Sequence, residues 1–181
     1  MVAALFFISE LTLGILKRAS RRTTTTRDRG SMAILWVVIL GSIVTAMLSA
    51  SWRSGRLPLY GPAREAVAIA VMTGGLLLRW ISIITLGRFF TVNVAAHADH
   101  KLVDFGPYRW VRHPSYTGLL ITFLGLGIFF GSWLAIVILL LPITLALLYR
   151  IRVEETALGE ALGAEYAPYQ ARTKRLIPGV L

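Results

Sequence analysis

A polar segment between two apolar stretches carries residue types that can do chemistry. Residues 100–118 contain histidines, arginines and tyrosines. Gly106 and Pro107 predict a turn, and Pro114 disfavours helical geometry at His113. We therefore expect a fixed irregular backbone here, whose unpaired amides and carbonyls can face a ligand.

The same segment has a simpler interpretation. Ser115 and Thr117 are residue types that cap helices, so the loop could serve only to begin the apolar helix that follows it. The length and polarity of the loop do not choose between a binding loop and a capping loop.

A second polar cluster follows the last apolar stretch. Arg150 and Glu154 are four residues apart, so a helix places them on one face, one turn apart, with Arg152 and Glu155 on a neighbouring face. One interpretation is an ordinary exposed ion pair at the membrane boundary, which stabilises little. The other is that Arg150 grips an anionic substrate group while Glu154 contacts a cation or hydroxyl of a cofactor. Spacing alone leaves both open.

Composition sets the class of protein. The chain has 181 residues, of which 56% are hydrophobic and 15% charged, and its mean hydropathy is +0.68. Ordinary soluble domains do not carry such a composition, so we expect an integral membrane protein.

Charge and metal-ligand content narrow the expected partners. The formal charge of +10 lies beside apolar stretches, so attraction to anionic lipid headgroups is expected and nucleic-acid binding is not. The chain has no cysteine, which excludes disulfides and a thiolate nucleophile. His97, Asp99, His100 and Asp104 match no familiar ligand spacing, so no metal site is expected.

Four apolar stretches must position these clusters: residues 2–16, 32–52, 66–87 and 119–149. A helix needs about 20 residues to cross a bilayer, so the second and third stretches are full spans and the first is short. The fourth is too long for one span and too short for two. We expect it to form two short or tilted helices that turn at Gly131 and Ser132, with Pro142 bending the second.

The expected fold is therefore all-α and polytopic, with about five transmembrane helices, the last two forming a hairpin. A cytoplasmic loop and an amphipathic C-terminal helical segment complete it. We expect one membrane domain over residues 1–181, with spans in 1–88 and the cofactor-binding, catalytic half in 89–181. Residues 2–16 lack a preceding basic region, so we do not expect a cleaved signal peptide.

The distribution of Lys and Arg predicts the orientation. Basic residues are concentrated in residues 17–29, 88–112 and beyond 149, and cytoplasmic loops carry an excess of Lys and Arg. These segments are therefore expected in the cytoplasm with the N-terminus outside. Compactness and the absence of organelle signals favour a bacterial inner membrane.

Two further features of the apolar stretches need an explanation. Arg79 lies within a span, so its charge requires a partner or a cavity. Glu10 is a candidate partner, and the alternative is that Arg79 lies near an acceptor channel. The pair Gly74–Gly75 and the residues Gly125, Gly127 and Gly131 are small residues of the kind that let helices pack closely.

Several ordered motifs in the second half of the chain point to one family. They are residues 100–103, 106–109 and 112–118, the Glu154–Glu155 pair, and Gly163, Tyr166, Tyr169 and Pro178. In this order they resemble the isoprenylcysteine carboxyl methyltransferase family and its bacterial relatives, within the membrane-embedded, phospholipid methyltransferase-like enzymes that use S-adenosylmethionine. The resemblance covers residues 86–178.

The resemblance implies an S-adenosyl-L-methionine site and a second role for the polar cluster on the last helix. The implied cofactor-binding residues are His100, Lys101, Leu102, Val103, Tyr108, His113, Pro114, Ser115, Tyr116 and Glu154. Arg150 is implied to bind the methyl acceptor, which makes Arg150 and Glu154 the catalytic residues. The implied acceptor is lipophilic and prenylated, and its reacting group is the carboxylate of an isoprenylcysteine.

The chemistry agrees with these implied roles. Methyl transfer from a sulfonium to a carboxylate is an in-line displacement that depends on positioning and dry surroundings, and an arginine can orient a carboxylate through two parallel hydrogen bonds. A phospholipid N-methyltransferase, an NADPH-dependent reductase of the sterol type and a non-catalytic scaffold are the alternatives. An arginine facing an amine would be unhelpful, which favours the carboxylate.

Overall fold

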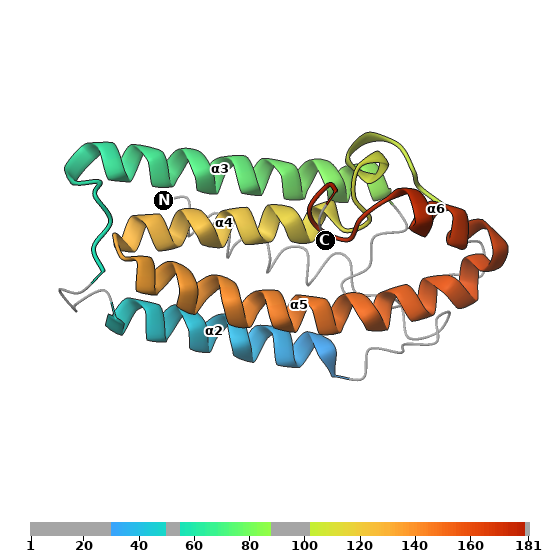
Figure 1. The fold of residues 1–181 in the computed structure, drawn as a ribbon, viewed down its shortest axis with the longest axis horizontal. Helices are drawn as coiled ribbons and strands as arrows, with labels where there is room; N and C mark the ends of the chain where they lie inside the picture. The colour runs from blue at the N-terminus through green and yellow to red at the C-terminus, as the bar shows by residue number, and fades with distance from the viewer. Residues whose placement is uncertain (1–29, 50–54, 88–101, 180–181) are drawn as a thin grey trace.

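A computed structural model describes residues 30–49, 55–87 and 102–179. Four helices lie side by side along the long axis (Figure 1): α2 (Ser31–Ser49), α3 (Gly61–Leu86), α4 (Pro114–Phe130) and α5 (Trp133–Leu162). Three short elements complete the described ranges: η2 (Gly106–Arg109), η3 (Gly163–Glu165) and α6 (Tyr166–Arg172). These ranges contain no β-strand, so the all-α prediction is confirmed.

Within the described ranges, the helices follow the order of the second, third and fourth predicted stretches, with the fourth divided into α4 and α5. α2, α3 and the helix that begins at Trp133 are long and apolar enough to cross a membrane, and α4 is a shorter apolar helix. The first predicted stretch, residues 2–16, lies outside the described residues.

The predicted hairpin turn is present between α4 and α5. Gly131 ends α4 in the left-handed region at φ 72°, which glycine adopts without steric cost. Ser132 caps α5 by accepting a hydrogen bond from the amide of Ala135. One part of the prediction is wrong: α5 is not short. It has 30 residues and contains Pro142. Good helix formers in the Arg150–Glu155 cluster and after it continue the apolar helix to Leu162.

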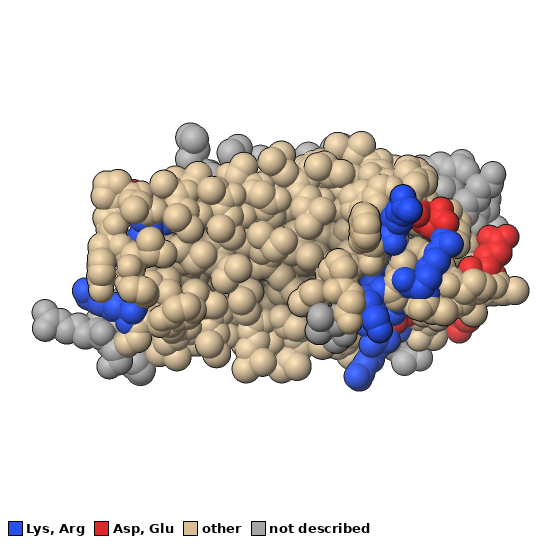
Figure 2. Space-filling view, turned by 45° about the horizontal axis from the view of Figure 1, so that its top comes forward, with Lys and Arg blue, Asp and Glu red and all other residues tan. Residues whose placement is uncertain are grey.

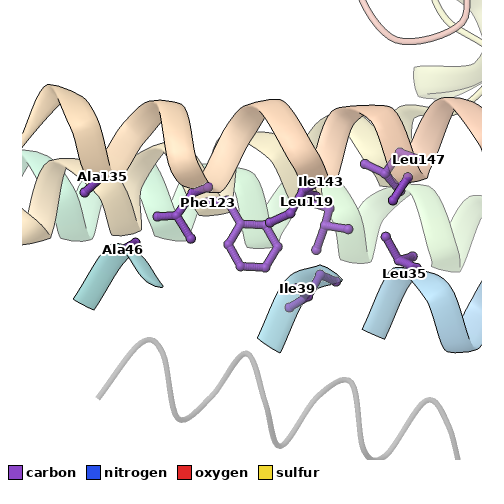
Figure 3. Close-up of a cluster of buried hydrophobic side chains, with 10 residues drawn as sticks. Leu35, Ile39, Ala46, Leu119, Phe123, Ala135, Ile143 and Leu147 are labelled. Carbon is purple, nitrogen blue, oxygen red and sulfur yellow. The ribbon is translucent and has the colours of Figure 1, made fainter. Parts of the chain in front are cut away.

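The core lies where α2, α4 and α5 meet. Figure 3 shows side chains from these helices pointing toward one another, and all of them are buried. The members labelled there are Leu35, Ile39, Ala46, Leu119, Phe123, Ala135, Ile143 and Leu147.

Gly75 and Gly125 let α3 approach α4 closely, as predicted. The prediction is wrong for Gly74, where an added Cβ would meet nothing within 4 Å. A Cβ added at Gly75 would lie 2.6 Å from the carbonyl oxygen of Gly118, and one added at Gly125 would lie 2.9 Å from that of Ala68. Both positions are closed to any larger residue unless the backbone moves. These contacts fix α3 against α4 and so position the N-terminal end of α4.

The outer surface suits a lipid environment. Large apolar side chains such as Val37, Val44, Leu141 and Leu145 are exposed along the helices. Figure 2 shows Lys, Arg, Asp and Glu gathered at one end of the molecule, a smaller basic group at the other and a long uncharged band between them. The chain is therefore an integral membrane protein, as its composition predicted.

Successive helices alternate in direction, so the polar clusters share one end. The N-terminal ends of α2 and α4 and the C-terminal ends of α3 and α5 lie at the charged end, beside α6 (Figure 1). At the opposite end the chain before α3 docks on the hairpin turn: Leu57 donates to Gly131 and Trp133 donates to Gly55 through backbone amides.

Candidate active site

The two polar clusters converge at the charged end. Tyr116 Oη donates a hydrogen bond of 2.5 Å to Glu154 Oε1, and Arg150 Nε donates one of 2.7 Å to Tyr116 Oη. Arg150 Nη2 lies 3.3 Å from Glu154 Oε1, and His113 Nδ1 lies 3.5 Å from Glu154 Oε2. The start of α4 and the C-terminal part of α5 therefore form one polar centre.

The ion pair at this centre is not an ordinary surface pair. The Arg150 side chain is 2% exposed and that of Glu154 is 19% exposed. An exposed pair contributes little, whereas a buried one is strongly coupled to its surroundings because each charge has lost its water. The interpretation as an exposed pair is therefore wrong.

A third helix helps to hold the guanidinium. Arg150 Nη1 donates a hydrogen bond of 3.1 Å to the hydroxyl of Ser31, the first residue of α2. Sequence reasoning missed Ser31, because a single serine at the start of an apolar stretch carries no motif. The contact spans 119 positions of the chain, so only the packing of α2 against α5 reveals it.

The backbone before α4 is held in the irregular shape that its prolines predicted. His113 precedes α4 with φ −125° and ψ 57°, and Pro114 is the first helical residue. The amides of Arg112 and His113 donate to the carbonyls of Lys174 and Arg175. The loop is therefore paired with the C-terminal segment, and no side chain caps α4. The expectation of unpaired amides is wrong at Arg112 and His113, because the C-terminal segment supplies their acceptors.

The capping interpretation of Ser115 and Thr117 is wrong. Ser115 Oγ accepts a hydrogen bond of 2.9 Å from Arg79 Nη1, and Thr117 Oγ1 donates one of 2.7 Å to the carbonyl of Leu176. Both hydroxyls thus join α4 to distant segments. Ser115 is a partner of Arg79, whereas Glu10 lies outside the described residues.

Tyr108 lies in η2 and is buried. Its hydroxyl donates to the carbonyl of Ser82 at 3.3 Å, and its own carbonyl accepts from Tyr169 Oη at 2.8 Å. Burial raises the pKa of Tyr108, and the nearby Glu154 carboxylate raises that pKa further. Tyr108 therefore stays neutral and keeps its hydroxyl proton as a donor.

The remaining predicted cofactor residues fall into three groups. Leu102 and Val103 are half-buried in the segment before η2. Pro114 is buried at the start of α4 beside Ser115. His100 and Lys101 lie outside the described residues.

Glu155 has partners that sequence spacing did not indicate. Its carboxylate is buried and accepts hydrogen bonds from Arg112 Nε at 2.8 Å and Arg175 Nη2 at 2.8 Å. Arg152, three residues before it, is exposed. The true partners stand 43 and 20 residues away along the chain, where no helical period could identify them.

The polar centre offers complementary chemistry. Glu154 presents carboxylate oxygens to a hydroxyl or a cation, and Tyr116 and His113 add aromatic surface, with their rings stacked at 5.7 Å. Arg150 supplies a fixed guanidinium suited to a carboxylate or phosphate. Such a set fits a ligand with both charged and aromatic parts.

Comparison with known proteins identifies relatives of this arrangement. Residues 67–160 match the model of the isoprenylcysteine carboxyl methyltransferase (ICMT) family. The chain is 32% identical over 114 residues to a probable protein-S-isoprenylcysteine O-methyltransferase of Oryza sativa subsp. indica, covering 62% of this chain and 60% of the relative. It is 36% identical over 102 residues to the protein-S-isoprenylcysteine O-methyltransferase of Saccharomyces cerevisiae, covering 55% of this chain and 43% of the relative.

A solved structure shares the fold. The eukaryotic intramembrane Ras methyltransferase ICMT superposes with a TM-score of 0.64 at 27% sequence identity, covering 80% of this chain and 52% of that chain. The chain thus spans about half of that protein, and 60% of the length of the rice relative.

Proposed function

Because the chain belongs to the isoprenylcysteine carboxyl methyltransferase family, we propose that it transfers a methyl group from S-adenosylmethionine to a carboxylate of a lipophilic acceptor of the isoprenylcysteine type. The observation that carries this proposal is the convergence of His113 and Tyr116 with Arg150 and Glu154 in one buried polar centre. The relatives are named for this reaction, and the chemistry of the centre is consistent with it.

The side chains of the centre suit the methyl donor. Glu154 is held by Tyr116 and Arg150 with 19% of its side chain exposed, so it can accept hydrogen bonds from hydroxyl or amino groups of the cofactor. The stacked rings of His113 and Tyr116 offer an aromatic surface, and Tyr108 keeps a neutral hydroxyl nearby. When bound, S-adenosylmethionine supplies an electrophilic methyl group on a positively charged sulfur.

Arg150 is the proposed acceptor-binding residue. Tyr116, Ser31 and Glu154 hold its Nε, Nη1 and Nη2 in one orientation. A guanidinium fixed in this way loses little conformational freedom when it binds a carboxylate. No general base is required of the chain, because an ionised carboxylate already carries the attacking electron pair.

The position of the centre suits two different entry routes. Exposed apolar side chains surround the helices, so a lipophilic acceptor can arrive from the bilayer. We propose that the charged end lies in the cytoplasm, with the N-terminus outside. The described basic residues of 109–112 and 150–175 lie at that end, and cytoplasmic loops carry an excess of Lys and Arg. The soluble methyl donor then enters from the cytoplasm. The proposed host membrane is a bacterial inner membrane.

Titration of the purified protein with S-adenosylmethionine, its demethylated product and NADPH tests the proposal. We expect saturable binding of the first two and none of NADPH. Binding of NADPH alone would favour a reductase, and binding of none would favour a scaffold. Incubating membranes with a labelled methyl donor and then hydrolysing the product with base separates a methyl ester, which the proposal requires, from a methylated headgroup amine.

A further inference from the structure

The second glutamate of the Glu154–Glu155 pair has no role in the proposed reaction, yet its carboxylate accepts three hydrogen bonds from two arginines. Arg112 Nε donates to its Oε1 at 2.8 Å, and Arg175 donates to its Oε2 through Nε at 3.0 Å and Nη2 at 2.8 Å. The Glu155 side chain is 7% exposed. A buried carboxylate is stable only when it is paired and hydrogen-bonded. Two guanidiniums carry two positive charges, which is more than is needed to neutralise one carboxylate.

The two arginines belong to segments that run side by side. Residues 173–176, which we name the C-terminal strap, pair in parallel with residues 111–113 through backbone hydrogen bonds of 2.7 and 3.0 Å. Arg112 also donates from Nη1 to the carbonyls of Gln170, at 3.0 Å, and Thr173. Thr117 binds the end of the strap at Leu176. Glu155 thus joins three elements: α5, the loop before α4 and the strap.

His113 connects this junction to the polar centre. Its imidazole lies between the two glutamates, with Nδ1 3.5 Å from Glu154 Oε2 and Nε2 3.5 Å from Glu155 Oε1. Its backbone amide is bonded to the strap at Arg175. The position of the ring that faces Glu154 therefore depends on both the Glu155 carboxylate and the strap.

We propose that Glu155 is a positioning residue that locks the C-terminal strap beside the loop before α4 through Arg112 and Arg175, and so holds His113 in place for the cofactor site. We call the contacts of Glu155 with Arg112 and Arg175 the lock. The effect of the lock on cofactor binding rests on the proposed function, whereas its effect on the position of the strap rests on these contacts alone. Arg175 is the accessible half of the lock, with 36% of its side chain exposed. The hydrogen bonds to Glu155 raise the pKa of Arg175, which is consistent with a permanently charged partner.

Arg175→Ala in the detergent-solubilised full chain is the test. It removes two of the three hydrogen bonds on Glu155 and leaves Arg150, Glu154 and Tyr116 in place. We expect hydrogen exchange of the Arg112 and His113 amides to become at least about tenfold faster. We also expect the dissociation constant for S-adenosylmethionine to rise about tenfold, with the KM for the acceptor unchanged, as is typical for loss of a contact that orients a binding residue. Arg175→Lys should recover part of both effects.

Lys174→Ala is the matched control. Lys174 is the neighbouring basic residue of the strap, and its side chain is exposed. Its backbone carbonyl, which accepts from Arg112, is retained in the variant, so exchange and cofactor affinity should stay at wild-type values. Unchanged exchange of the two amides in Arg175→Ala would overturn the lock, and faster exchange with unchanged cofactor affinity would overturn the positioning role. Failure of the wild-type protein to bind S-adenosylmethionine would instead overturn the proposed function, while the exchange measurement would still decide the lock.

Discussion

The two ends of α4 are closed in opposite ways. At the hairpin end, Gly131 and Ser132 close the helix with their own backbone and a local cap, and the chain before α3 adds two backbone hydrogen bonds. At the charged end, side chains of α4 and the loop before it reach residues 34 to 61 positions away. The conformation of the turn at the first end is set by local geometry, and its long-range contacts are backbone hydrogen bonds. The second end depends on buried charged side chains from several elements. The chemistry lies at the second end.

This contrast is tested most strongly at Arg150. Arg150→Ala should reduce methyl transfer by about 100-fold or more, because it removes the acceptor contact and leaves Glu154 and Tyr116 without their buried partner. Initial rates with a labelled methyl donor measure this loss. Arg150→Lys keeps the charge without the planar fork and should remain well below wild type. Wild-type turnover in Arg150→Ala would place the chemistry elsewhere.

The lock at the charged end should dominate stability. Glu155→Gln keeps the size of the side chain but leaves Arg112 and Arg175 without a negative partner. We expect a loss of about 3 kcal/mol in the free energy of unfolding, seen as a fall of roughly 6–12 °C in Tm. Glu165→Gln, at an exposed carboxylate, should change stability by no more than about 0.5 kcal/mol. Equal effects of the two substitutions would show that Glu155 is not structurally special.

A substitution at the contact between α3 and α4, midway between the two ends, should have an intermediate effect on stability. Gly75→Ala places a Cβ 2.6 Å from the backbone of Gly118 and Thr122, so α3 must move away from α4 at a cost of about 1–3 kcal/mol. Gly74→Ala meets nothing within 4 Å and should stabilise the helix slightly. Thermal unfolding of both variants in the same detergent gives the comparison. A more stable Gly75→Ala protein would contradict the close approach.

The hairpin end should give the smallest effect and leave the chemistry unchanged. Ser132→Ala removes the cap on Ala135 and should cost about 1 kcal/mol of stability. Methyl-transfer rates at saturating substrate should match those of the wild type, because the turn lies at the opposite end from Arg150. A large loss of turnover would show that the two ends are coupled.

The same contrast explains what the sequence could predict. The hairpin turn was predicted at the correct residues, because Gly131 and Ser132 act through local backbone conformation. The Arg150–Glu154 contact was predicted too, because the helical period places those residues on one face. Local rules worked wherever the interacting groups are close along the chain.

The long-range contacts could not be predicted in the same way. Nothing in the local pattern distinguishes Arg112 and Arg175 from other basic residues near a membrane. Helical spacing points instead to Arg152, three residues before Glu155, which is exposed. Ser115 was interpreted as a cap because its local context favours that role, whereas packing of α3 on α4 brings Arg79 to it. Tertiary packing decided these pairings.

The most direct test of the central claim is methyl transfer from labelled S-adenosylmethionine to a farnesylated cysteine with a free carboxylate, catalysed by the purified full chain. The same compound with its carboxylate already esterified is the control. We expect saturable formation of a base-labile ester on the free carboxylate, strongly reduced in Arg150→Ala and, through weaker cofactor binding, in Glu154→Gln. Absence of transfer to the free carboxylate, or equal labelling of the esterified control, would contradict the assignment of this buried centre to carboxyl methylation.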